Sequence, residues 1–145
     1  MACPYFYPKG LLDASGWVAA PRLPLGDAYS GECRASEIAF QPDETRTRQT
    51  CNVGYARRCC DRFPRESQSD AVRFHVAEDS GERIRLQYIF EKECWPGAHG
   101  VLDYSVNEHQ LAGDNTDGIL RTQAGVFLES YLRRRDESKS SAAAG

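Results

Sequence analysis

The residues with the most distinctive chemistry in this chain are its six cysteines, because a thiolate binds soft metals, joins disulfides and acts as a nucleophile. Cys3, Cys33, Cys51 and the adjacent pair Cys59–Cys60 lie in the first 60 residues, and Cys94 stands apart. The spacings are wide, C-x29-C, C-x17-C and C-x7-CC, so no two cysteines form a C-x2-C pair. Separated thiols in a segment rich in proline and aromatic residues indicate a bound metal or cluster more than a single reactive cysteine.

Two of the cysteine segments resemble each other. Cys3-Pro4-Tyr5-Phe6 and Cys60-Asp61-Arg62-Phe63 both read Cys-x-x-Phe, with a proline close by. A thiolate on a stiff turn beside a bulky aromatic ring suits an iron–sulfur cluster, whose potential depends on solvent exposure and on hydrogen bonds to its sulfurs. Cys33 and Cys51 also lie in segments that contain glycine and tyrosine.

Several stretches together resemble an uncharacterised bacterial protein family with four separated cysteines. These stretches are Cys3-Pro4, Leu25-Gly26-Asp27, Cys51-Asn52-x-Gly54-Tyr55-Ala56, and Cys60-x-x-Phe63-Pro64 followed by Asp70-Ala71-Val72-Arg73-Phe74. The likeness continues through Tyr88, Glu91 and His99-Gly100 to the last helix, so it covers most of the chain. It implies that four cysteines act together, and it favours Cys60 over Cys59 as the fourth. No activity and no counterpart for Cys94 come with it.

We therefore predict a small iron–sulfur protein in which one [4Fe–4S] cluster is ligated by Cys3, Cys33, Cys51 and Cys60. A cluster with four protein thiolates has no open iron site, so electron transfer, redox sensing or structural support is expected rather than Lewis-acid catalysis. The first alternative is a structural zinc-binding interaction module. Zinc is the common ion of four-cysteine structural sites, although its ligand pairs are usually close in sequence.

The adjacent Cys59 and Cys60 leave a second alternative open, a cysteine-based thiol oxidoreductase. Three neighbouring arginines would favour a thiolate at either position, and these are Arg57, Arg58 and Arg62. Adjacent cysteines form a disulfide only through a strained ring, so we interpret one of them as a ligand and the other as a bystander. The phosphate-loop, dinucleotide and hydrolase motifs are missing from the sequence, which therefore predicts no enzyme class.

Composition places the chain among ordinary globular proteins, with 145 residues of which 41% are hydrophobic and 27% charged. A formal net charge of -3 disfavours a nucleic-acid partner, so a redox partner or another protein is expected instead. The N-terminus does not read as a signal peptide, and no window has the roughly 20 apolar residues of a membrane span. These features predict a reducing cytoplasm, where separated cysteines bind metal more often than they form disulfides.

The elements that must position the cysteines are predicted to form a single α+β domain over residues 1–135. Residues 1–70 hold six of the seven prolines and read as a loop-rich half that bears the cofactor. In residues 71–135, alternating patterns at 72–77, 83–90 and 101–106 predict a three-stranded antiparallel meander with a turn at 95–100. A C-terminal helix follows, with several candidate N-caps in 114–117 and an apolar stripe from Leu120 to Leu132. Residues 136–145 read as a disordered tail.

Overall fold

Two antiparallel sheets and one long helix make up the computed structural model, which describes residues 2–13, 23–113 and 117–144, with side chains described as far as residue 138. The smaller sheet pairs two strands, β1 (Phe6–Leu12) and β2 (Ala28–Cys33). The larger sheet is a meander of four strands, β3 (Ala71–Asp79), β4 (Arg83–Lys92), β5 (Trp95–Ser105) and β6 (Gln110–Ala112). Between the sheets in sequence lie the short turns α1 (Glu44–Arg46) and η2 (Thr47–Cys51, π-helical), and the chain ends in α2 (Gly118–Ala144). The expected mixture of helix and antiparallel strands is confirmed.

The larger sheet differs from the predicted meander in its extent. Its third strand, β5, begins at Trp95, where the sequence predicted a turn, and β6 adds a fourth strand. The turn lies instead at Glu93 and Cys94, both of which have a positive φ (50° and 66°). Gly100 lies within β5, and the position requires glycine because a side chain there would collide with the Tyr88 ring on β4. Gly100, which suggested a turn, therefore serves close packing between two strands.

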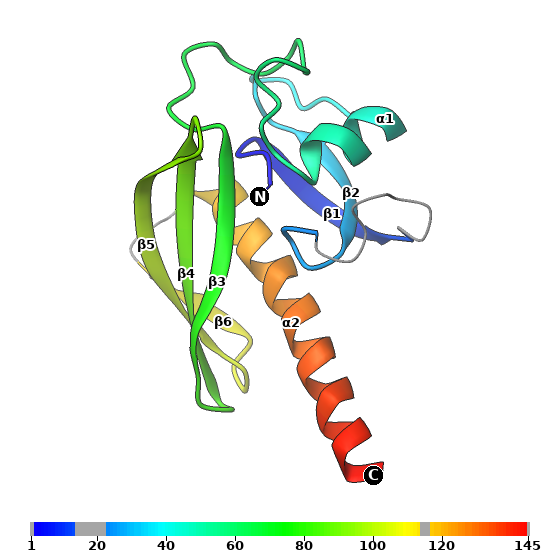
Figure 1. Cartoon of the computed structure of the whole chain (residues 1–145), viewed down its shortest axis with the longest axis vertical. Helices are drawn as coiled ribbons and strands as arrows, with labels where there is room; N and C mark the ends of the chain where they lie inside the picture. Colours follow the sequence, from blue (N-terminus) through cyan, green and yellow to red (C-terminus); the bar gives the residue numbers. More distant parts are fainter. Residues whose placement is uncertain (1, 14–22, 114–116, 145) are drawn as a thin grey trace.

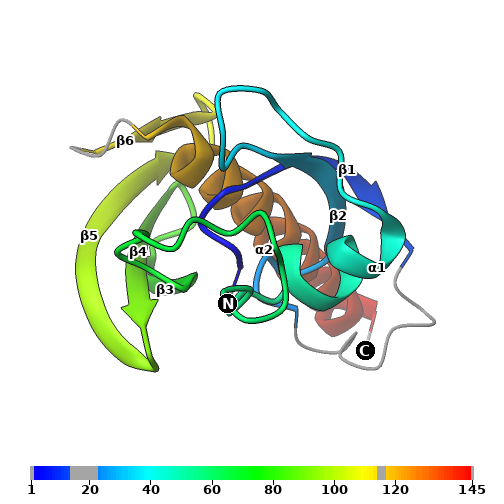
Figure 2. The same cartoon turned by 90° about the horizontal axis from the view of Figure 1, so that it is seen from above.

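The apolar stripe of α2 forms the centre of the fold. Figures 1 and 2 show this helix lying between the two sheets. Its first turn is capped by Asp117, whose carboxylate accepts hydrogen bonds from the backbone N–H groups of Ile119 and Leu120 at 2.8 and 3.1 Å. Asp117 is thus the N-cap among the expected candidates, and positions 114–116 lie outside the described residues. Leu120 and Leu128 are buried in the core with the inner residues of β4 and β5.

The helix continues through residues 136–144, where the sequence predicted a disordered tail. This stretch has no proline or glycine, and it ends in three alanines, the strongest helix formers. In Figure 1 the last turns of α2 extend past the sheets. No helix in the described ranges combines the length and the apolar character needed to cross a bilayer.

The N-terminal half is more regular than the sequence predicted, because β1 and β2 pair within it. Proline and glycine make these strands hard to recognise in the sequence, and Pro8 and Gly10 flank a register shift in β1. The two halves meet where Ala2 and Val72 exchange backbone hydrogen bonds of 2.8 and 2.9 Å. This contact ties the N-terminus to the edge strand β3, and it places Cys3 beside the larger sheet.

Candidate metal centre: a pocket with four thiols

Four cysteines from four separate segments line one partly enclosed pocket, and we call them the pocket cysteines: Cys3, Cys33, Cys51 and Cys60. The cavity between them is small, about 20 Å³, which is close to the room that one water molecule needs. Its walls include four aromatic side chains, Tyr5, Phe6, Phe40 and Phe63. The structure thus brings together the same four cysteines that the sequence predicted as ligands, and all four are free thiols.

Cys3 and Cys60 sit in two copies of the same turn. In the first, the N–H of Phe6 donates to the carbonyl of Cys3 at 3.1 Å, and in the second the N–H of Phe63 donates to that of Cys60 at 3.2 Å. Each phenylalanine is then buried against the pocket, with 1% of Phe6 and 7% of Phe63 exposed. The Cys-x-x-Phe repeat in the sequence is therefore a repeated structural unit, in which an i to i+3 hydrogen bond holds a sulfur beside an aromatic wall.

Cys51 and Cys33 each end a regular element. Cys51 is the last residue of η2, and its carbonyl accepts a hydrogen bond of 3.1 Å from the N–H of Cys3. Cys33 ends β2, where its backbone exchanges hydrogen bonds of 2.6 and 2.9 Å with Phe40. Backbone contacts thus join Cys3 directly to Cys51 and fix Cys33 to a wall residue of the pocket. The four thiols depend on regular secondary structure as well as on loops.

Two buried amide side chains support this arrangement, and sequence analysis missed both. Asn52 follows Cys51 and donates to the carbonyls of Tyr29 and Thr47 at 2.9 Å, while its own oxygen accepts from the N–H of Tyr29 at 3.0 Å. Its amide therefore pairs with the edge of β2 as a strand residue would. The signal for a structural role was its place beside a cysteine, but the partner lies 23 residues away.

Gln123 supports the Cys3 segment in the same way as Asn52 supports Cys51. It lies on α2 with no exposed surface, and its amide nitrogen donates to the carbonyls of Cys3 and Phe6 at 2.8 and 2.7 Å. The position of this amide in the apolar stripe of the helix is a signal visible in the sequence, because a polar side chain on a buried face needs a partner. The helix thereby anchors the first Cys-x-x-Phe turn.

Burial keeps the two innermost thiols protonated. It raises the pKa of Cys3 from 9.0 to about 12, while a hydrogen bond from the Tyr5 backbone opposes this, and the other three pocket cysteines raise the pKa further. Burial likewise raises the pKa of Cys51 to about 12, against a hydrogen bond from Thr50. These thiols are not activated nucleophiles at neutral pH. Only a metal that replaces their protons would convert them to thiolates.

Arginine side chains border the pocket. Arg62 stacks on the Phe40 ring with its guanidinium carbon 3.5 Å from the ring centroid, and Arg46 lies over the same ring at 5.6 Å. Both arginines also line the pocket. Arg46 forms an ion pair of 2.6 Å with Asp61, whose side chain is largely exposed. The rim of the pocket therefore carries an aromatic ring and two arginines, one of them paired with an exposed carboxylate.

The remaining two cysteines lie elsewhere. Cys59 and Cys94 are both exposed, and both line a second surface cleft together with Tyr55, Arg57 and Asp70. Cys60 lines the pocket and Cys59 lines the second cleft, so these adjacent residues belong to two different sites.

No group of three or more histidine, cysteine, aspartate or glutamate side chains in the described part of the chain is arranged to hold a metal ion. Comparison of the chain with protein-family models, with curated proteins and with solved structures finds no match. No ligand or activity is therefore transferred from a relative, and the chemistry of the pocket follows from its own residues.

Proposed function

We propose that this protein binds an iron–sulfur cluster, [4Fe–4S], through the four pocket cysteines. One observation carries the proposal: four thiols from four separate segments meet in one pocket, and the two remaining cysteines lie outside it. Soft thiolate ligands suit iron–sulfur clusters and zinc alike. The aromatic side chains around the thiols favour a cluster, because the potential of a cluster depends on shielding from water.

The surroundings of the thiols also support a redox cofactor. Aromatic walls such as Tyr5 and Phe63, whose rings meet edge to face at 5.5 Å, exclude water from one side of the pocket. Low solvent exposure and hydrogen bonds to sulfur set the potential of an iron–sulfur cluster. With four protein ligands no iron is left open to substrate, so the function is electron transfer, redox sensing or structural support in a reducing cytoplasm.

A protein or redox partner would approach at the rim, where Arg46 and Arg62 surround Phe40. Arg62, beside the ion pair of Arg46 with Asp61, favours a partner with an acidic surface and makes its association sensitive to salt. What the cluster itself supplies is the capacity to gain or lose an electron. The residues of this chain hold the cluster, limit its contact with water and orient the partner.

Anaerobic purification tests the proposal directly. The protein is expected to be brown, with about four iron and four sulfide per chain, as the formula of the cluster requires. A colourless protein with one zinc per chain would overturn the iron–sulfur assignment and leave the structural zinc module. A protein with neither metal would leave the pocket thiols as a buried structural cluster.

Two adjacent residues provide a matched pair of variants. Cys60→Ser removes a thiol that lines the pocket, and it is expected to abolish iron binding because three soft ligands remain in a site built for four. Cys59→Ser makes the same chemical change one residue away, at an exposed side chain, and is expected to keep the iron. Cys94→Ser is a second control. Loss of iron in Cys59→Ser with retention in Cys60→Ser would contradict the ligand assignment.

A further inference from the structure

The two cysteines outside the pocket share a cleft of their own. We propose that Cys59 and Cys94 form a redox-active dithiol, which closes to a reversible disulfide across this cleft. Both thiols are free and exposed, and both line the cleft although 35 positions separate them in the sequence. This modification site is distinct from the four-thiol pocket, and it does not depend on which metal the pocket binds.

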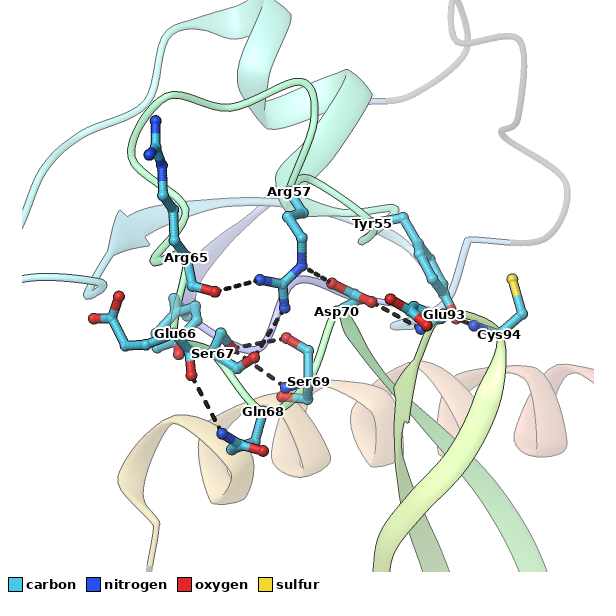
Figure 3. A network of polar contacts seen from close by, with 11 residues as sticks. Tyr55, Arg57, Arg65, Glu66, Ser67, Gln68, Ser69, Asp70, Glu93 and Cys94 are labelled. Carbon is cyan, nitrogen blue, oxygen red and sulfur yellow. Dashed lines mark hydrogen bonds and ion pairs between the residues drawn. The ribbon is translucent and has the colours of Figure 1, made fainter.

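Cys94 is held in a defined place by an unusual turn. Glu93 and Cys94 occupy the tip between β4 and β5 with φ values of 50° and 66°, a conformation that asparagine and glycine adopt far more readily. Two contacts hold this turn: the N–H of Glu93 donates to Asp70 at 2.9 Å, and the N–H of Cys94 donates to the Tyr55 hydroxyl at 3.1 Å. Figure 3 shows Cys94 beside Tyr55 at this tip.

The same two residues that hold the hairpin tip also hold the segment that leads to Cys59. The N–H of Tyr55 donates to the carbonyl of Asp70 at 3.0 Å, and the guanidinium of Arg57 forms an ion pair of 2.7 Å with the Asp70 carboxylate. Arg57 also donates to the carbonyl of Ser67 at 2.9 Å, and Figure 3 shows this contact within the wider polar network. Asp70 thus joins the two walls of the cleft and keeps both cysteine-bearing turns facing one opening.

Cys60 is a poor disulfide partner for Cys59 for two reasons. The N–H groups of Cys59 and Cys60 both donate to the carbonyl of Ala56, at 2.9 and 2.7 Å, so both cysteines belong to one tight turn. Their side chains line different cavities, Cys60 the pocket and Cys59 the cleft. A disulfide between adjacent residues would also need a strained ring. Among the described thiols, Cys94 is the partner that shares the cleft with Cys59.

The chemical step is a thiol–disulfide exchange with a small disulfide such as oxidised glutathione. One protein thiol attacks the reagent, which releases one reduced thiol and leaves a mixed disulfide on the protein. The second protein thiol then attacks the mixed disulfide, so the protein disulfide forms and a second reduced thiol leaves. Two S–H bonds and one S–S bond are broken and re-formed, and the two protons end on the reagent. Closure requires the two Cα atoms to come within about 7 Å of each other.

Formation of this bond would connect the turn that carries Cys60 to the tip of the larger sheet. Cys59 lies one residue before a pocket cysteine, whereas Cys94 lies between two strands of the meander. The disulfide would therefore tie the N-terminal half to the meander at a second point, beside the contact between Ala2 and Val72. Oxidation of the cleft would in this way limit the freedom of one ligand turn.

Peptide mapping of the anaerobically purified protein tests the pairing. The protein is equilibrated with oxidised glutathione, its free thiols are blocked, and it is digested without reduction. Trypsin cuts after Arg58, Arg62, Lys92 and Arg121, which releases residues 59–62 and 93–121 as separate peptides. We expect these two peptides to be joined, with loss of two free thiols per chain and with fragment ions that place the bond on Cys59.

The variants make the outcome decisive. Cys59→Ser and Cys94→Ser should each lose the cross-linked species, and reduction should remove it from the wild type. A cross-link that maps to Cys60, a disulfide inside peptide 59–62, or glutathione left on both cysteines would overturn the proposal. Iron measured on the same samples separates this result from the proposed function, because the cross-link is expected whether or not iron is present.

Discussion

Replacement of Asn52 by leucine tests whether the pocket depends on a single buried amide. Leucine has the same branching at Cγ as asparagine and is larger, so Asn52→Leu removes three hydrogen bonds without opening a cavity. Asn52 is 1% exposed, and its side chain is the partner of both the N–H and the carbonyl of Tyr29. Because these two groups bond to Asn52, they point away from β1 and lose their partner in the variant.

The expected cost follows from the groups that remain. A buried main-chain group left without a partner costs about 1–3 kcal/mol, and two such groups remain at Tyr29. The carbonyl of Thr47 keeps a bond of 3.2 Å from the N–H of Asn52, so its loss is smaller, about 1 kcal/mol. After about 1 kcal/mol for the added apolar burial of leucine is subtracted, the free energy of unfolding is expected to fall by about 2–6 kcal/mol. This is a large share of the roughly 5–15 kcal/mol that stabilises a domain.

Urea unfolding measures this loss. For an m value of about 2 kcal/mol/M, the midpoint should fall by about 1–3 M. Asn107→Leu is the matched control, since it makes the same change at an exposed loop position and should stay within about 0.5 kcal/mol of the wild type. Because Asn52 fixes the end of η2, Asn52→Leu should also lower the iron content. A loss under about 1 kcal/mol would refute the reasoning, because it would mean that the Tyr29 groups find other partners.

The cysteine set was predictable because its signal lies in residue types and in a local repeat. Cys3 and Cys60 share a four-residue pattern, and such a short pattern already specifies the turn that the structure shows twice. That the four thiols bind a cluster stays a prediction. The choice of Cys60 over Cys59 rested on the same pattern and on the family resemblance, and of the two only Cys60 lines the pocket.

The strands could be predicted where alternation of apolar and polar residues was clean, as in β3 and β4. The first half of β5 was not predicted, because Pro96, Gly97 and Gly100 are typical of a turn. Gly100 is needed for β5 to pack against Tyr88. Strands β1 and β2 were not predicted for a similar reason, since proline and glycine interrupt their alternation of apolar and polar residues. In both cases a contact with another strand overrides the local preference of the residues.

The polar residues that hold the site were the least predictable part. Asn52, Gln123 and Asp70 each bond to backbone groups that lie 23 or more residues away in the sequence. The spacing of residues in the sequence cannot identify such a partner, because the two groups meet only after the chain has folded. A polar residue on a buried face, as at Gln123, shows that a partner exists and leaves its identity open.

Two further predictions concern Cys3 and its surroundings. Gln123→Met should lower the free energy of unfolding by about 1–3 kcal/mol and reduce the iron content, because the carbonyl of Phe6 loses its donor while that of Cys3 keeps a second one. Glu129→Met, an exposed position on the same helix, is its control in the same urea assay. The second prediction concerns alkaline pH. In the metal-free protein, burial raises the pKa of Cys3 and Cys51 from 9.0 to about 12. Between these values the unfolded chain loses both protons while the folded protein keeps them, so the stability that the protonated thiols provide below pH 9 falls as the pH rises. The slope is at most about 1.4 kcal/mol per pH unit for each thiol. Urea midpoints measured from pH 8 to above pH 10 should therefore fall less steeply in Cys3→Ala than in the wild type. Equal slopes would contradict the burial of an un-ionised thiol at Cys3, since every other titrating group is common to both proteins.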